Sequence, residues 1–166
     1  MPYFEYRQNN SGGYYYGPAK IVIIEAHDGA HADTIAVDTF DAKLEMAKQF
    51  GATTLVNAET EDPVAAAFAN GRGADVAFEV IGIKPTMEQA INAVRSGGEV
   101  ILVGVPRMDV MLELNVAFTF LYVNKTIKGC WYGSANVNED VPKLLDLWRN
   151  GDLMLEELIS QRIGVQ

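Results

Sequence analysis

The stretch that most constrains the fold of this 166-residue chain is residues 34–51, which read as a buried strand running directly into a helix. The strand is the apolar run Ile35–Val37, and it stops at Asp38. The helix is indicated by apolar residues at helical spacing, which are Leu44, Ala47 and Phe50. An acidic residue at the tip of a buried parallel strand is where a doubly wound sheet binds the ribose hydroxyls of a dinucleotide. Asp38 is therefore the first candidate binding residue.

The ends of this helix carry the residues that commonly cap helices. Thr39 or Asp41 can accept a hydrogen bond from the first free amides. Gly51 stands where a left-handed residue commonly ends a helix. The stretch therefore predicts a complete strand–helix unit.

Strands and helices then alternate along the rest of the chain. Apolar runs predict strands at 53–56, 75–80, 99–104 and 126–132. Amphipathic stretches predict helices from Pro63, around Met87–Val94 and at 141–148, with a turn or two of helix within 116–123. This rhythm predicts an α/β, Rossmann-like three-layer fold, in which helices cover both faces of a mostly parallel sheet.

Residues 1–33 follow a different pattern. They predict a hairpin with its turn at 9–13, followed by a strand at Ile21–Ile24. Only about nine residues separate that strand from the next, whereas a parallel crossover needs about a dozen or more. We therefore expect an atypical antiparallel β element at the edge of the sheet, replacing the first β-α unit within a single domain of residues 1–166.

Charge and composition exclude several classes of partner. The chain carries 22 acidic and 13 basic residues, a net charge of −9, which disfavours nucleic acid and anionic membrane. No apolar run approaches the roughly 20 residues needed to span a bilayer, and the N-terminus lacks a signal-peptide pattern. The lone Cys130 cannot form an internal disulfide. We expect a cytoplasmic protein.

Two histidines offer an alternative binding function. His27 and His31 are four residues apart, so on a helix they would share a face and could bind a divalent metal. Gly29 weakens such a helix, and the competing interpretation is a solvated connection. We therefore assign no metal ligand.

From about residue 34 to residue 163 the chain resembles the nucleotide-binding domain of medium-chain, zinc-type alcohol dehydrogenases. The resemblance is carried by IAVD at 35–38, KLEMAKQFGAT at 43–53, FEVIG at 78–82, GGEVILVGVP at 97–106, TIKGCWYGS at 126–134 and DVPKLLDLWRNGDLMLEELISQRI at 140–163. These segments follow one another in the order and spacing of that family.

The resemblance implies a set of NAD-contacting residues. Asp38 would bind both adenosine ribose hydroxyls and select NAD over NADP, because its charge repels a 2′-phosphate. Lys43 would reach the same ribose. The implied cofactor-binding set is Asp38, Lys43, Ile81, Gly82, Val103, Val105 and Tyr132, in which Ile81 and Gly82 line the groove and the last three offer backbone groups near the nicotinamide carboxamide.

The chain also departs from that family. No G-x-G-x-x-G turn, which would bind the pyrophosphate, occurs before Thr34. One cysteine and two histidines are too few to rebuild the family's zinc sites. We therefore expect NAD binding to be weak or lost, no zinc, no catalytic residue and no autonomous dehydrogenase activity. The junction at residues 25–34 is typical of a truncated, chimeric sequence.

A non-catalytic function is the alternative. The family dimerises through the edge strand of this domain, so the strand Ile127–Tyr132 could pair across a two-fold axis. The chain would then be a homodimeric structural module without cofactor binding. An ordinary covered edge is the competing interpretation of the same residues.

Overall fold

The computed structural model describes residues 7–8, 14–15, 22–27 and 31–159. The expected turn at 9–13 and the end of the chain from residue 160 lie outside the described residues. The chain divides into two compact units, of which one is Pro18–Trp131 and the other combines Met1–Gly17 with Tyr132–Gln166. Each unit is described by itself.

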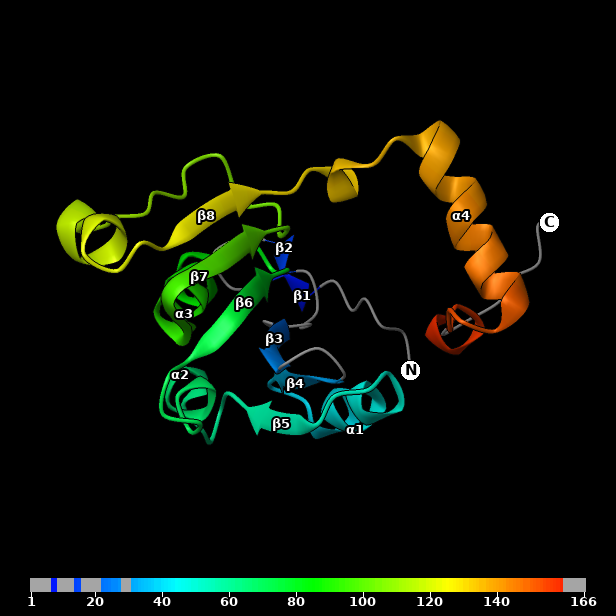
Figure 1. Cartoon of the computed structure of the whole chain (residues 1–166), viewed down its shortest axis with the longest axis horizontal. Coiled ribbons are helices and arrows are strands. Elements are labelled where there is room, and N and C mark those ends of the chain that lie inside the picture. The colour runs from blue at the N-terminus through cyan, green and yellow to red at the C-terminus, as the bar shows by residue number, and fades with distance from the viewer. Residues whose placement is uncertain (1–6, 9–13, 16–21, 28–30, 160–166) are drawn as a thin grey trace. The chain divides into compact units, whose positions relative to one another are not determined.

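The larger unit is built on a six-stranded sheet with the order β5-β4-β3-β6-β7-β8. Its strands are β3 (Val22–His27), β4 (His31–Asp38), β5 (Thr54–Asn57), β6 (Ala74–Glu79), β7 (Val94–Leu102) and β8 (Thr126–Gly129). The pairs β4–β5, β6–β7 and β7–β8 are parallel, and Figure 1 shows the arrows of β6, β7 and β8 pointing the same way. The expected α/β, Rossmann-like architecture is confirmed.

Strand β3 is the exception in this sheet. It lies between β4 and β6 and pairs antiparallel with both. The strand order is that of a Rossmann sheet, 3-2-1-4-5-6, with β3 in the place of the first strand but reversed. The expected antiparallel pairing is confirmed, whereas the expected edge position is wrong. A continuous apolar run suits a strand covered on both faces, which is a central position.

Three helices of the larger unit follow its strands. They are α1 (Asp41–Gln49), α2 (Pro63–Ala67) and α3 (Lys84–Ala93). Residues of α2 and α3 form the main core with one face of the sheet, the members being Ile35, Val37, Val56, Ala67, Ala74, Ala77, Ala90, Ile91, Ala93, Val94 and Val100. Because side chains alternate along a strand, Ala36 and Asp38 face the opposite side, where α1 contacts β4 and buries Leu44.

Local hydrogen bonds explain the ends of these helices. Gly51 has φ 96°, and its amide donates to Lys48 O while that of Ala52 donates to Ala47 O, which is the Schellman arrangement. Asp62 caps α2 through a 2.9 Å bond from the Val64 amide. The expected capping of α1 by Thr39 or Asp41 is wrong, because Phe40 is the N-cap residue and no side chain caps that helix.

Several boundaries differ from those expected. Helix α3 ends at Ala93 and β7 begins at Val94, so residues 94–98 belong to the strand instead of ending the helix. The helical turn expected within 116–123 is the π-helix η1 (Ala117–Leu121). Strand β8 ends at Gly129, three residues before the expected end.

The smaller unit contains the remaining elements. Strands β1 (Arg7–Gln8) and β2 (Tyr14–Tyr15) pair antiparallel, which confirms a hairpin. The unit continues with the 3₁₀ turn η2 (Tyr132–Ser134), helix α4 (Val137–Asn150) and the 3₁₀ turn η3 (Glu156–Leu158). Among the described residues, no helix is both long enough and apolar enough to cross a bilayer.

Candidate functional site

The candidate binding residues gather at the edge where β4, β6 and β7 end. Because β4 and β6 both run antiparallel to β3, they run parallel to each other, and β7 is parallel to β6. Val22 of β3 stands opposite Ala36 on one side and Phe78 on the other, which places β4 and β6 about 10 Å apart across β3. The carboxyl ends of these strands are where an open α/β sheet binds ligands.

Asp38 is the last residue of β4 and is buried, with 5% of its surface exposed. Its Oδ1 accepts hydrogen bonds from the backbone amides of Thr39, at 2.7 Å, and Phe40, at 2.9 Å. Its backbone carbonyl accepts from the amide of Ala58, which follows β5. The carboxylate is therefore held in one orientation by the loop between β4 and α1.

Lys43 lies in the first turn of α1, directly after that loop. Its Nζ is 5.9 Å from the centre of the Phe40 ring, within the range of a cation–π contact. The ring is 52% exposed and lies beside the loop that holds Asp38. Asp38 and Lys43 are thus brought to the same end of β4.

The next four candidates lie on two loops that touch each other. Ile81 and Gly82 follow β6, while Val103 and Val105 follow β7. Gly82 has φ +87°, and a Cβ built on it would lie 2.5 Å from the carbonyl carbon of Val105. Glycine is therefore required at residue 82 for both its backbone conformation and its close packing.

Gly104 makes the same contact from the other loop. A Cβ at residue 104 would lie within 2.5 Å of the backbone nitrogen of Ile81 and closer still to that of Gly82. The amides of Val103 and Gly104 both donate to the carbonyl of Glu79, at 2.8 and 2.9 Å. The two loops are therefore packed backbone against backbone.

Glu79 is a residue of this site that the sequence analysis missed. It ends β6 with no exposed surface, and its Oε1 accepts from the amides of Ile81 and Gly82, at 2.9 and 2.8 Å, and from Thr86 Oγ1, at 2.7 Å. Its Oε2 has no hydrogen-bond partner among the described residues. A signal was present, because Glu79 stands at the tip of an apolar strand, as Asp38 does.

The loop after β7 ends in an exposed ion pair. Arg107 Nη2 lies 2.6 Å from Asp109 Oδ2. The hydrogen bond from the Arg107 side chain lowers the pKa of the Asp109 carboxyl below its usual 3.8. Both side chains are largely exposed, so this pair adds little to stability.

The remaining sequence candidates lie elsewhere. Tyr132 is 84% exposed and belongs to the smaller unit, whereas the other six candidates belong to the larger unit, so its part in the site stays a prediction. His27 and His31 are strand residues paired in the β3–β4 hairpin, so the helix on which they would share a face does not form. Among the described residues, no group of three or more potential metal ligands comes together.

The arrangement offers oxygen acceptors and backbone groups, but no cradle for phosphate in its described part. Pyrophosphate binding needs several amides converging at a helix N-terminus after the first strand. Here β3 is followed by β4 after the three residues 28–30, which leaves no room for a helix. The described residues therefore lack the helix N-terminus at which a Rossmann site holds pyrophosphate.

The six-stranded order and the acidic tip of β4 define the class, a Rossmann-type nucleotide-binding domain. The particular family follows from comparison, because residues 21–150 match the family model described as zinc-binding dehydrogenase. The chain belongs to this family, as the residues at 34–163 suggested. The match starts at residue 21 and so takes in β3 as well.

Similar proteins agree with this assignment. The chain is 33% identical to an NDMA-dependent alcohol dehydrogenase of Amycolatopsis methanolica over 147 residues, which are 85% of this chain and 38% of that protein. It is 33% identical to a D-xylulose reductase of Saccharomyces cerevisiae over 138 residues, or 79% of this chain and 37% of that protein. It thus spans little more than a third of these relatives.

Solved structures show the same relation. The benzyl alcohol dehydrogenase of Acinetobacter calcoaceticus superposes with a TM-score of 0.67 at 34% identity, over 71% of this chain and 33% of that one. An alcohol dehydrogenase from Thermus sp. ATN1 gives 0.65 at 31% identity, over 76% and 35%. The chain therefore resembles the NAD-binding domain of alcohol dehydrogenases and spans about a third of the length of these proteins.

Proposed function

We propose that this chain is an NAD(H)-binding domain that binds the cofactor weakly and does not turn over an alcohol by itself. Asp38 would accept hydrogen bonds from the adenosine ribose, with Lys43 beside it. The backbone groups of the loops after β6 and β7 would meet the nicotinamide end. The position of Tyr132 in this scheme stays a prediction.

One observation carries the proposal. The buried carboxylate of Asp38 stands at the carboxyl end of β4, on the edge where the loops that contain Ile81–Gly82 and Val103–Val105 begin. Its orientation is set by two backbone amides, so it needs little rearrangement to accept a ribose hydroxyl. Its negative charge favours NAD over NADP, because a 2′-phosphate would be repelled.

The expected weakness follows from the reversed central strand. In a Rossmann site the pyrophosphate is held at the N-terminus of the first helix, and the hairpin between β3 and β4 replaces that helix here. The chain also has one cysteine and two histidines, too few for the family's zinc centre. We therefore propose binding without hydride transfer for this chain alone.

The test is a calorimetric titration of the purified chain with NADH, repeated for Asp38→Ala and Asp38→Asn. We expect saturable binding with a Kd below about 1 mM, or more than about 4 kcal/mol of binding free energy. We expect Asp38→Ala to weaken it at least tenfold, and NADPH to bind more weakly than NADH to the wild type.

Asp38→Asn separates charge from hydrogen bonding. It keeps an oxygen acceptor for the Thr39 and Phe40 amides, so the loop stays in place while the charge that repels a 2′-phosphate is removed. We expect it to reduce the preference for NADH over NADPH. A titration of the wild type that shows no heat of binding up to several millimolar would refute the proposed function.

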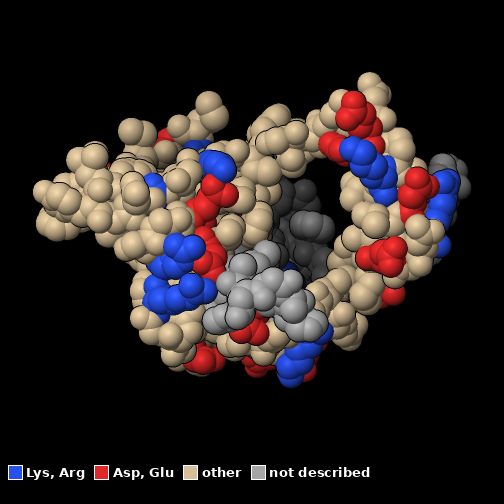
Figure 2. Space-filling view, in the orientation of Figure 1, with Lys and Arg blue, Asp and Glu red and all other residues tan. Residues whose placement is uncertain are grey.

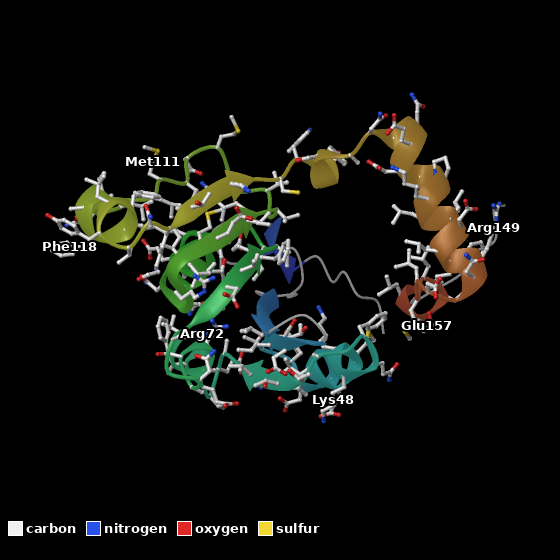
Figure 3. All side chains as sticks on the ribbon, in the orientation of Figure 1. Lys48, Arg72, Met111, Phe118, Arg149 and Glu157 are labelled. Atoms are coloured by element: carbon white, nitrogen blue, oxygen red, sulfur yellow. The ribbon has the colours of Figure 1, made fainter. Side chains whose placement is uncertain are left out.

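A second candidate function is a homodimeric structural module. Met111, Phe118, Leu121, Tyr122 and Trp131 of the larger unit are each 69–75% exposed. Figure 2 shows the segment that carries η1 as an uncharged surface, and Figure 3 shows Met111 and Phe118 pointing outward. Strand β8 is the last strand of the sheet, so among the described residues of the larger unit no strand pairs with its outer edge. These observations favour contact with a second copy.

A further inference from the structure

We propose that Glu79 is a positioning residue that holds the two cofactor-facing loops in one arrangement. The inference rests on the proposed function, because it assigns Glu79 to the binding of NAD(H). Glu79 would not touch the cofactor itself. It would act through the backbone of the loops that do.

Glu79 contacts both loops at once. Its side-chain Oε1 bonds to the amides of Ile81 and Gly82 in the loop after β6. Its main-chain carbonyl bonds to the amides of Val103 and Gly104 in the loop after β7. One residue therefore receives four backbone amides, two from each loop.

The third donor to Oε1 connects the loop to helix α3. Thr86 Oγ1 lies 2.7 Å from Oε1 and 3.0 Å from the carbonyl of Ile83, which is the N-cap residue of α3. Thr86 is itself buried. The loop after β6 is thereby held between the end of its strand and the start of its helix.

Burial of the Glu79 carboxyl group costs stability, but its hydrogen bonds define the geometry of the loop after β6. A buried carboxylate whose Oε2 has no partner among the described residues is unfavourable to bury. Oε1 accepts three hydrogen bonds of 2.7 to 2.9 Å, however, and their directions fix the orientation of the side chain relative to the loop. The side chain therefore contributes chiefly by orienting the amides of Ile81 and Gly82.

The close packing of the loops transmits this orientation. Gly82 and Gly104 leave no room for a Cβ on either side, so the loop after β7 must follow any shift of the loop after β6. Four of the seven proposed cofactor-binding residues lie on these two loops: Ile81, Gly82, Val103 and Val105. Loosening Glu79 should therefore weaken NADH binding without removing any group that touches it.

The experiment uses Glu79→Gln, which keeps the size of the side chain and removes its charge. We expect two effects: at least tenfold weaker NADH binding by calorimetry, and about tenfold faster hydrogen exchange of the Ile81 and Gly82 amides by NMR. The amides of Gly51 and Ala52 at the end of α1 serve as reference and should keep their exchange rates. A merely structural role would change all four amides together through the global stability.

The matched control is Glu88→Gln. Glu88 lies on α3, is 41% exposed and makes only a loose 3.7 Å ion pair with Lys84, so it carries the same charge change outside the site. We expect its NADH affinity to stay within about twofold of the wild type. If Glu79→Gln fails to fold, Thr86→Val removes one of the three donors, and we expect it to weaken binding about threefold.

The outcomes separate the two proposals. Unchanged NADH affinity and unchanged exchange in Glu79→Gln, or in Thr86→Val where that variant is used, would overturn the role of Glu79. A wild-type chain that binds no NADH would overturn the proposed function and with it the role of Glu79 in cofactor binding. In that case selective exchange at Ile81 and Gly82 would still show that Glu79 holds the loop.

Discussion

Among the glycines of the described residues, Gly104 has the shortest distance between an added Cβ and a backbone atom. It has no positive φ, so glycine is needed there only because the neighbouring chain is too close for a Cβ. The atoms that a Cβ would meet are backbone atoms of Ile81 and Gly82, which cannot rotate away. Relief would require moving one of the two loops.

We predict that Gly104→Ala destabilises the protein by more than about 2 kcal/mol, which is the usual scale of overpacking. Gly129→Ala is the matched control, because a Cβ there would meet nothing within 4 Å, and we expect a change below about 0.5 kcal/mol. Urea unfolding followed by circular dichroism measures both. Equal effects of the two substitutions would contradict the contact between the loops.

The residues of the site differ in how far the sequence could reveal them. The position of Asp38 follows from a local pattern, an apolar run that stops at an acid. Glu79 shows the same pattern, but its importance depends on Val103 and Gly104, which are distant in sequence and join it only in the folded sheet. Tyr132 was placed by resemblance alone, and the structure puts it in the other unit.

At the scale of elements, the carboxyl end of α3 accepts a hydrogen bond from a lysine in the segment that follows η1 in the sequence. Lys125 Nζ donates a 2.8 Å hydrogen bond to the carbonyl of Ile91. Partial burial lowers the pKa of Lys125 below its usual 10.5, because the charged form loses hydration. The native state therefore binds this proton less tightly than the unfolded chain does.

The sign of the pH effect follows directly. Between the lowered native pKa and 10.5 the unfolded state holds more protons, so the contribution of Lys125 to stability rises with pH in that interval. At neutral pH the cost of burying the charge is fully present. We predict that Lys125→Met lacks this increase. As pH rises, the free energy of unfolding of the wild type should therefore increase relative to that of the variant.

Urea unfolding at a series of pH values from neutral to 10.5 measures this difference. Lys48→Met is the control, since that side chain is 54% exposed and paired with Glu45 on the surface of α1. Its difference from wild type should not show the same rise. Parallel stability curves for wild type and Lys125→Met would contradict the burial of the charge.

Most elements could be predicted from the sequence because their signals are local. Pro63 indicated the start of α2, and Gly51 takes the left-handed conformation expected after α1. The antiparallel direction of β3 followed from its short connection to β4, but its central place could not be read from the sequence. The strands that lie on either side of an apolar run such as Ile21–Ile24 are determined by the pairing of the whole sheet.

At the scale of the whole molecule, the exposed apolar residues before and after β8 predict self-association. Ile127 packs against the buried core, so a charge there would unfold the chain rather than test an interface. Phe118 is the better probe, because it is 69% exposed and contacts only the edge of Tyr122 among the ring contacts described. Covering this surface would remove apolar area from water.

We predict that the wild-type chain is a dimer and that Phe118→Glu raises its dissociation constant at least tenfold, because the charge would be buried at the interface. Phe50→Glu is the control. Phe50 is an exposed residue at the end of α1, and α1 lies between β4 and β5 in the chain, at the end of the strand order opposite to β8. Sedimentation equilibrium measures both. A monomeric wild type at tens of micromolar would exclude the structural module.

The reversed β3 also changes how the sheet can be assembled. In an all-parallel sheet, two neighbouring strands can pair only after a long crossover connection has closed, and such non-local pairing raises contact order and slows folding. Here β3 and β4 are joined by three residues, and β3 pairs along its whole length with residues 31–36 of β4 in a hairpin. Closing so short a loop costs little chain entropy. The central strand pair of the sheet, which in an all-parallel sheet joins residues far apart in sequence, here joins residues close in sequence. Strand β6 can then pair with a hairpin that is already formed.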